Sequence, residues 1–170
     1  MSDAPRIAVA QVGFLGEDLD EHVDRIKAII DEHRDADLLV FPELILHGHP
    51  TVDQPAGFLY RRSRALYGPA SREIRAFVRE RDARVIIGEI RRRKERLFNL
   101  ATYIDRERTQ HYTKTHVHWT EAFVRGRSLR TFDTPLGKVG INICFDAAFP
   151  EVWRVLALRG AEVIVNISAV

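Results

Sequence analysis

The sequence predicts one domain of the α/β class, spanning residues 1–170. Apolar, β-branched runs of strand length alternate with longer segments whose apolar residues recur at helical spacing. The strand-like runs are almost continuously apolar, which is typical of a sheet that helices cover. Hydrophobic residues make up 45% and charged residues 29% of the chain, so its composition fits a globular domain with its own core.

The N-terminal half is predicted to alternate between strands and helices. Its first helix places Leu19, Val23 and Ile26 on one face, and either Asp18 or Asp20 is expected to cap it. The second strand ends at a proline, which lacks a ladder donor, and the second helix begins with a proline in its first turn. The predicted elements are a strand at 6–12, a helix at 18–34, a strand at 37–44, a loop at 45–62 and a helix at 68–82.

The C-terminal half is predicted to begin with short strands and to end with a β-α-β pattern. The arginine-rich segment 91–96 lies between two strands, so it is interpreted as a solvated hairpin turn, with a nucleic-acid patch as the alternative. Gly160 is expected to end the last helix. The predicted elements are strands at 84–91, 97–104 and 109–114, a strand–turn–strand unit at 129–144, a helix at 150–160 and a strand at 162–170.

Charge and cysteine content limit the classes of function. The formal net charge is +2, which gives no strong field for nucleic acid or an anionic membrane. One cysteine forms no internal disulfide, and the sequence shows neither a signal-peptide pattern nor an apolar run of membrane-spanning length. We therefore expect a cytoplasmic protein that acts on a small molecule and binds neither nucleic acid nor membrane.

Three chemically different residues follow three predicted strands. They are Glu43, Lys114 and Cys144, and ligands of open α/β sheets bind beyond the carboxyl ends of strands. Together they fit covalent catalysis, with a thiol nucleophile, a carboxylate base and an ammonium that stabilises an oxyanion beside the backbone N–H of Phe145. From the residues alone, a cysteine that ends a strand, such as Cys144, is more often a core thiol than a nucleophile. A loop cap is the alternative for Glu43, and an exposed strand end is the alternative for Lys114.

Three motifs in order carry a family resemblance. FPELILHG around Glu43, YTKTHVHWTEAF around Lys114 and GINICFDAAFPE around Cys144 resemble blocks of the nitrilase superfamily of carbon–nitrogen hydrolases. The resemblance implies that these three residues are the catalytic glutamate, lysine and nucleophile, and that Glu121 is a second glutamate of the site. It extends over residues 6–168, because IAVAQ and GAEVIVNIS also resemble family segments.

The same resemblance implies a fold and a reaction. The fold is an α-β-β-α sandwich, and because family chains are longer, this chain is expected to lack the C-terminal part of that fold. The reaction is hydrolysis of an amide or carbamoyl carbon–nitrogen bond through a cysteine thioester, without a metal or other cofactor. A homo-oligomer is expected if the fold is complete.

The alternatives concern the substrate and the activity of the chain. Phe145 and Asp146 after the cysteine favour an amidase or carbamoylase, and nitrile hydrolysis is the alternative within the family. Ala147 and Ala148 stand where carbamoyl amino acid hydrolases often have a carboxylate-binding arginine, which favours a neutral or differently anchored amide. The other alternative is an inactive truncated fragment that acts at most as a binding or assembly module.

Aromatic and histidine residues near the motifs have two interpretations each. Trp119 and His118 are candidates to line the substrate pocket, and core packing is the alternative for Trp119. The pairs His47/His49 and His116/His118 have metal-like spacing. No neighbouring cysteine or carboxylate set completes a tetrahedral site, so we expect structural or pocket-lining histidines and no metal.

Overall fold

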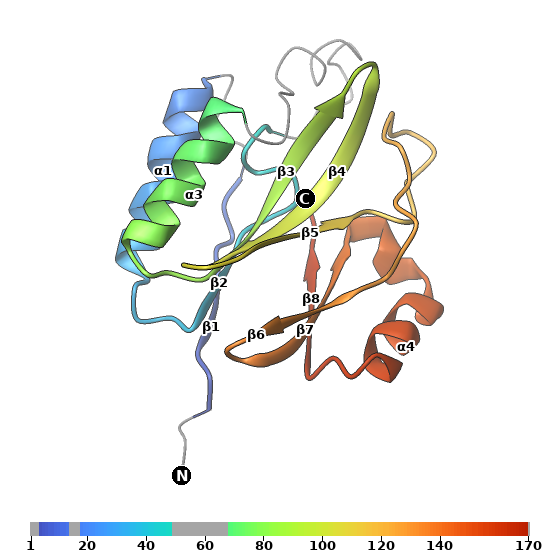
Figure 1. Cartoon of the computed structure of the whole chain (residues 1–170). Helices are drawn as coiled ribbons and strands as arrows, with labels where there is room; N and C mark the ends of the chain where they lie inside the picture. The colour runs from blue at the N-terminus through green and yellow to red at the C-terminus, as the bar shows by residue number, and fades with distance from the viewer. Residues whose placement is uncertain (1–3, 14–17, 49–67, 170) are drawn as a thin grey trace.

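The computed structural model describes residues 4–13, 18–48 and 68–169 and contains two β-sheets between helices (Figure 1). The first sheet has the order β1-β2-β3-β4-β5, parallel from β1 to β3 and antiparallel from β3 to β5. Its strands are β1 (Ile7–Val9), β2 (Leu38–Val40), β3 (Val85–Arg93), β4 (Arg96–Ile104) and β5 (Thr109–Thr113).

The second sheet has the order β6-β7-β8. Strands β6 (Thr131–Thr134) and β7 (Gly137–Ile143) form an antiparallel hairpin, and β8 (Val163–Ile167) runs parallel to β7. Helix α4 (Pro150–Leu158) provides the crossover between these parallel strands. It packs closely on β7, because a Cβ atom built on Gly140 would lie 3.2 Å from the Cβ of Leu156.

The helices cover the outer faces, so the layers follow the expected α-β-β-α order (Figure 1). Helices α1 (Leu19–Glu32) and α3 (Pro69–Glu80) lie side by side on the first sheet, and α4 lies beyond the second. Of the two predicted caps for α1, Asp18 is the one observed, since its Oδ1 accepts a 2.8 Å hydrogen bond from the backbone N–H of Asp20. The predicted α/β class is confirmed.

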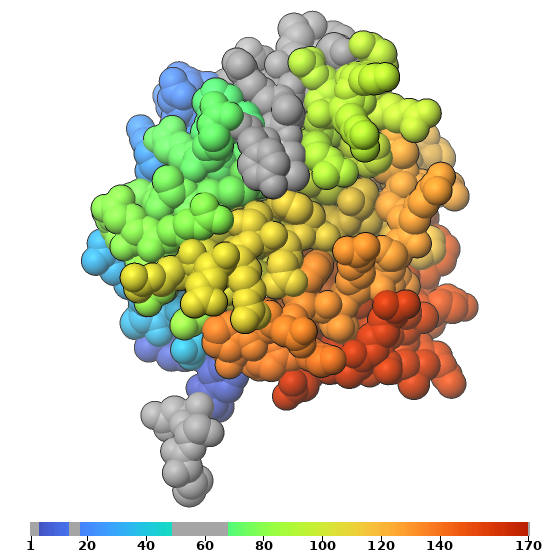
Figure 2. All heavy atoms as spheres, viewed as in Figure 1, coloured from blue at the N-terminus to red at the C-terminus, as the bar shows by residue number. Residues whose placement is uncertain are grey.

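Residue alternation along the strands divides the interior into two main cores. On β2, Leu39 packs under α1 and α3, whereas Leu38 and Val40 face the second sheet. On β3, Val85 and Ile87 likewise face the helices. Figure 2 shows that the yellow residues around β5 lie at the surface between the green residues of α3 and the orange residues leading into β6.

Several strands are shorter than the sequence predicts. The apolar runs 6–12, 37–44 and 162–170 contain strands of three, three and five residues. After β2, Pro42 has no N–H for the ladder and Leu44 has a left-handed φ of 56°, so the chain turns away from the sheet. Of the predicted loop 45–62, residues 45–48 form turn and irregular backbone, and 49–62 lie outside the described residues.

The arginine-rich segment forms the predicted hairpin turn. Arg93 pairs with Arg96 across β3 and β4, and Lys94 between them adopts a left-handed φ of 54°. The last helix also ends as expected, because Gly160 has a φ of 83° and donates its N–H to the carbonyl of Ala157. Among the described residues, no helix is both long enough and apolar enough to cross a membrane.

Candidate active site

The carboxylate of Glu43 and the ammonium of Lys114 form a buried ion pair where the two sheets meet. Glu43 Oε1 lies 2.9 Å from Lys114 Nζ, and both side chains are removed from water. The Cys144 thiol is half-buried beside them, and its electrostatic neighbours are Glu43, Lys114 and Glu121. The structure therefore brings together the three residues that follow the predicted strands.

Two left-handed backbone positions aim these side chains. Leu44, directly after Glu43, has a φ of 56°, and Cys144 itself has a φ of 45°. Cys144 directly follows β7 as the first residue of the 3-10 helix η1 (Cys144–Ala148), so the strained residue makes a sharp bend that exposes its sulfur to the site. A non-glycine residue in this region carries a strain of about 1–3 kcal/mol, which the surrounding structure must offset.

Gly88 allows the segment carrying Glu43 to lie directly on β3. A Cβ atom on Gly88 would lie 2.6 Å from the carbonyl carbon of Glu43 and closer still to backbone atoms of Pro42 and Leu44. Backbone hydrogen bonds fix this approach, since Gly88 N–H donates to Pro42 O at 3.2 Å and Leu46 N–H donates to Gly88 O at 3.2 Å. No side chain larger than hydrogen fits at residue 88 without moving the Glu43 backbone.

Three donors engage the Glu43 carboxylate. Asn99 Nδ2 donates to Oε1 at 2.7 Å, Lys114 contacts the same oxygen, and the backbone N–H of Ala169 donates to Oε2 at 3.1 Å. Asn99 comes from β4 and Ala169 follows β8, so the carboxylate joins the two sheets. Sequence reasoning missed Asn99, although an amide in the otherwise apolar centre of LFNLATYI was a signal that could have identified it.

Glu121 lies next to Lys114, as the resemblance implies. Its Oε1 is 2.7 Å from Lys114 Nζ, and its Oε2 accepts the backbone N–H of His118 at 3.1 Å. Burial alone lowers the pKa of Lys114, but the charge of Glu43 and hydrogen bonds to Glu121 and Glu43 outweigh burial and raise it above its ordinary value. Lys114 is therefore an ammonium at neutral pH.

Asp146 ties the bend at Cys144 to the segment after Lys114. Its Oδ2 accepts hydrogen bonds from Tyr112 Oη at 2.8 Å and from Ile143 N–H at 3.0 Å, while its Oδ1 accepts from Thr115 Oγ1 at 2.8 Å and His116 N–H at 2.7 Å. The carboxylate is fully buried. Its contribution to the site was not visible in the sequence, because three of the four donors, Tyr112, Thr115 and His116, lie 30 to 34 residues earlier in the chain.

The environment of Cys144 keeps its sulfur protonated at rest. Burial raises the pKa of the thiol, and the negative charge of Glu43 raises it further, against a smaller lowering by Lys114. A thiol in this state is a weak nucleophile, since the thiolate is the attacking species. The arrangement therefore requires a base in contact with the thiol, and the Glu43 carboxylate is the adjacent one.

Aromatic rings surround the bend after Cys144. The Phe145 ring makes edge contacts with His118 at 5.0 Å and with Phe149 at 5.4 Å between ring centroids, and His118 lies against Trp119 at 3.6 Å. The Trp119 side chain is 82% exposed, so the core-packing alternative for this residue is wrong. Phe145, Trp119 and His118 thus form one aromatic group beside the candidate nucleophile.

The paired histidines have structural partners. His47 Nδ1 accepts the backbone N–H of Ile90 at 3.0 Å, and His116 Nδ1 lies 3.0 Å from Asp146 Oδ1. His49 lies outside the described residues. Within residues 4–13, 18–48 and 68–169, no group of three or more histidine, cysteine or acidic residues is placed to hold a metal ion.

Residues 6–170 match the family model of the carbon–nitrogen hydrolases. The chain therefore belongs to the carbon–nitrogen hydrolase family, within the nitrilase superfamily. An (R)-stereoselective amidase of a Pseudomonas species is 34% identical over 134 residues, which cover 77% of this chain and 47% of the amidase. A nitrilase of Pyrococcus abyssi is 29% identical over 153 residues, which cover 86% of this chain and 58% of the nitrilase.

Solved structures share the fold. The crystal structure of an amidase from a Nesterenkonia species superposes with a TM-score of 0.84 at 24% identity, and covers 98% of this chain and 65% of that one. A carbon–nitrogen hydrolase from Helicobacter pylori superposes with a TM-score of 0.83 at 20% identity, over 98% of this chain and 60% of that one. The chain thus spans about half the length of the curated relatives it matches.

Proposed function

We propose that this chain carries the catalytic residues of an amidase, which hydrolyses a carbon–nitrogen bond through a thioester on Cys144. The observation that carries the proposal is the buried Glu43–Lys114 pair, with Lys114 Nζ 2.9 Å from Glu43 Oε1, beside a cysteine on a left-handed bend. A carbon–nitrogen hydrolase family match supports the same class of reaction.

In the first step, Glu43 removes the thiol proton as the Cys144 sulfur attacks the amide carbon. The carbonyl π electrons move to oxygen, and the resulting oxyanion is stabilised by the Lys114 ammonium and the backbone N–H of Phe145. Protonated Glu43 then gives its proton to the leaving nitrogen. The carbon–nitrogen bond breaks, ammonia or an amine departs, and the acyl group remains on sulfur.

In the second step, water hydrolyses the thioester. Glu43 accepts a proton from water as the hydroxyl oxygen attacks the acyl carbon, and Lys114 again stabilises the oxyanion. The carbon–sulfur bond breaks, the carboxylic acid leaves, and the sulfur recovers its proton from Glu43. Because its pKa is raised, Lys114 stays positively charged through both steps and acts by charge rather than by proton transfer.

The substrate proposed for this site is a neutral amide. Ala147 and Ala148 offer no cation for a substrate carboxylate directly after the nucleophile bend. The exposed Trp119 ring and the edge of Phe145 offer an apolar surface at the same place, which suits an aliphatic or aromatic acyl group. The similarity to an (R)-stereoselective amidase supports amide chemistry, and nitrile hydrolysis stays the alternative because a nitrilase is also similar.

The test is ammonia release by the purified chain, with circular dichroism to establish that it is folded. We expect release from propionamide or benzamide, none from the Cys144→Ala variant, and an acyl mass increment on wild-type protein quenched during turnover. Turnover of nitriles but not amides would favour the family alternative. A folded chain that forms no adduct and releases no ammonia from any substrate would instead be a binding or assembly module.

A further inference from the structure

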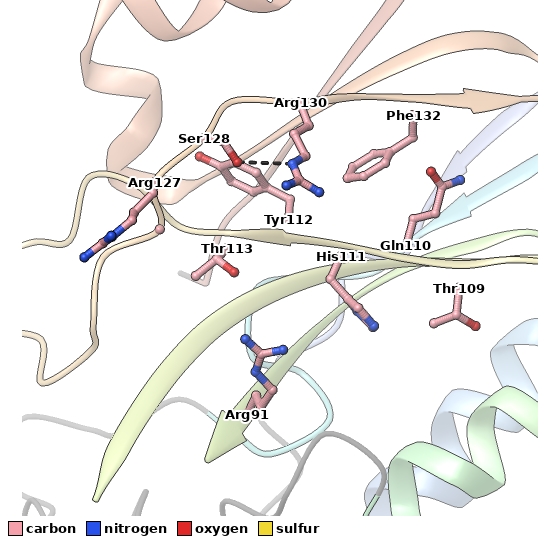
Figure 3. Close-up of a pocket in the computed structure, with 11 residues that line it drawn as sticks. Arg91, Thr109, Gln110, His111, Tyr112, Thr113, Arg127, Ser128, Arg130 and Phe132 are labelled. Carbon is pink, nitrogen blue, oxygen red and sulfur yellow. Dashed lines mark hydrogen bonds between the residues drawn. The ribbon is translucent and has the colours of Figure 1, made fainter. Parts of the chain in front are cut away.

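A pocket of about 470 Å³ lies along β5, apart from the candidate active site. Figure 3 shows its lining, which comes from β5, the end of β3 and the segment 126–132. Glu43, Lys114 and Cys144 are not among the lining residues. Nothing in the proposed amidase reaction uses this pocket.

The lining is strongly basic. It includes the guanidinium groups of Arg91, Arg127 and Arg130, and it contains no aspartate or glutamate. Among the described residues none of these three arginines forms an ion pair, whereas Arg34, Arg75 and Arg81 each contact a carboxylate. The charge of the pocket is therefore not neutralised by the protein, which favours an anionic occupant.

Arg91 packs against an aromatic ring and keeps one hydrogen-bond donor unused. Its guanidinium lies over the Phe98 ring at 5.2 Å, and its Nε atom is buried without a hydrogen-bond partner among the described residues. In Figure 3, Arg91 and Arg130 extend toward the Thr113–His111 stretch of β5 from opposite sides, whereas Arg127 extends away from it. Arg130 is oriented by a 3.1 Å hydrogen bond from its Nε to Ser128 Oγ.

Neutral donors complete the lining. Thr109, Thr113 and Ser128 contribute hydroxyl groups. Lys114 N–H donates to Asn99 O across the β4–β5 ladder, and antiparallel ladder bonds alternate along a strand. The backbone N–H of His111 therefore points to the outer edge of β5, and β5 is the last strand of the first sheet. An outward backbone N–H and three hydroxyl groups beside guanidinium groups suit an oxyanion with several acceptor oxygens.

The imidazole ring of His111 also lines the pocket, and its protonation depends on the charges around it. Burial, together with the smaller effect of the positive charges of Arg75 and Arg91, lowers the pKa of His111 to about 4. Glu89 Oε1 is 4.0 Å from the ring, but this carboxylate is already bonded to Arg75, Ser71 and Thr102. At neutral pH the ring therefore adds no charge, and the uncompensated field of the pocket is that of its arginines.

We propose that this pocket binds a small molecule through a phosphate group, with Arg91 and Arg130 as the charged ligands. Guanidinium groups bind phosphate bidentately, and hydroxyl and backbone N–H donors of the lining satisfy its remaining oxygens. The volume is larger than one inorganic phosphate, so a phosphate monoester with an organic part of modest size fits. Free phosphate and a phosphate ester share this chemistry.

The experiment measures phosphate binding by isothermal titration calorimetry on the purified chain. Inorganic phosphate and glycerol phosphate are titrated separately, to distinguish a free anion from an ester. We expect saturable one-to-one binding, which Arg91→Gln and Arg130→Gln each weaken by about tenfold. Arg93→Gln is the matched control, because Arg93 is exposed at the tip of the same hairpin and does not line the pocket.

A second measurement tests phosphate binding independently of any change in the folding stability of the variants. A bound phosphate adds negative charge next to His111, so the pKa of His111 measured by NMR should rise when phosphate is added to wild-type protein. Arg91→Gln should need about tenfold more phosphate for the same rise. Three outcomes overturn the proposal. They are absence of saturable binding, equal weakening by Arg93→Gln, and binding that leaves the His111 titration unchanged. Loss of amidase activity in any variant would not bear on it.

Discussion

Asn99 and Lys114 both bond the same oxygen of Glu43. Asn99 Nδ2 is 2.7 Å and Lys114 Nζ is 2.9 Å from Glu43 Oε1, and the second contact is a buried ion pair. The Asn99 Oδ1 atom is buried without a partner among the described residues, so this side chain gains hydrogen bonding only through its amide donor. The geometry makes Asn99 a positioning residue for the proposed base.

Replacing Asn99 should lower turnover more than stability. In Asn99→Leu, Glu43 loses one neutral hydrogen-bond donor. The substitution also removes the buried Oδ1 atom of Asn99, which has no partner among the described residues. We expect kcat to fall about tenfold, with KM and the free energy of unfolding little changed. Asn99→Asp should be worse, because it places a second carboxylate against Glu43. A kcat for Asn99→Leu within twofold of wild type would contradict the positioning role.

Gly88→Ala should destabilise the fold by about 3 kcal/mol, because the new methyl group overlaps the backbone of residues 42–44. Urea unfolding followed by circular dichroism measures the change. Gly13→Ala is the matched control, since a Cβ atom there has no neighbour within 4 Å and should alter stability by a few tenths of a kcal/mol at most. Equal effects of the two substitutions would show that the close approach at Gly88 is not important.

Asp146→Asn should uncouple the nucleophile bend from the segment after Lys114. Asp146 Oδ2 accepts hydrogen bonds from Tyr112 Oη and from Ile143 N–H. An asparagine side chain has only one acceptor oxygen, because its nitrogen is a donor, so it cannot accept all four hydrogen bonds of the carboxylate. We expect a loss of about 3 kcal/mol in the free energy of unfolding, measured by urea titration. The exposed Asp133→Asn is the control for removing one negative charge, and it should change stability by less than about 0.5 kcal/mol.

Alkylation by iodoacetamide should follow the ionisation of Cys144 alone, because the chain has one cysteine. We expect an apparent pKa above the ordinary 9.0, since burial and the Glu43 charge both disfavour the thiolate. Glu43→Gln removes the largest unfavourable charge and should lower this pKa. Lys114→Met removes the favourable charge and should raise it. Shifts in the reverse directions would mean that these groups do not face the sulfur.

Strand and helix periodicity predicted the α/β class, because periodicity is a property of neighbouring residues. The layer order and the roles of Glu43, Lys114 and Cys144 were expected from the resemblance of three motifs, and the structure places these three residues next to one another. Strand ends were harder to predict. The runs 6–12 and 37–44 look uniformly apolar, yet pairing stops where Pro42 and the turn at Leu44 redirect the chain. The contact of Asn99 with Glu43 and the contacts of Tyr112, Thr115 and His116 with Asp146 could not be predicted, because tertiary packing alone brings these residues together.

Joining the two sheets through Glu43 has an evolutionary consequence. Its carboxylate is bonded from β4, from the end of β5 and from the backbone after β8, all within the interior. Well-packed apolar residues in place of such a buried pair are often neutral or stabilising by about 1–4 kcal/mol. Selection for stability alone would therefore remove this pair. A lineage that keeps Glu43 and Lys114 must obtain its folding stability from other parts of the sandwich.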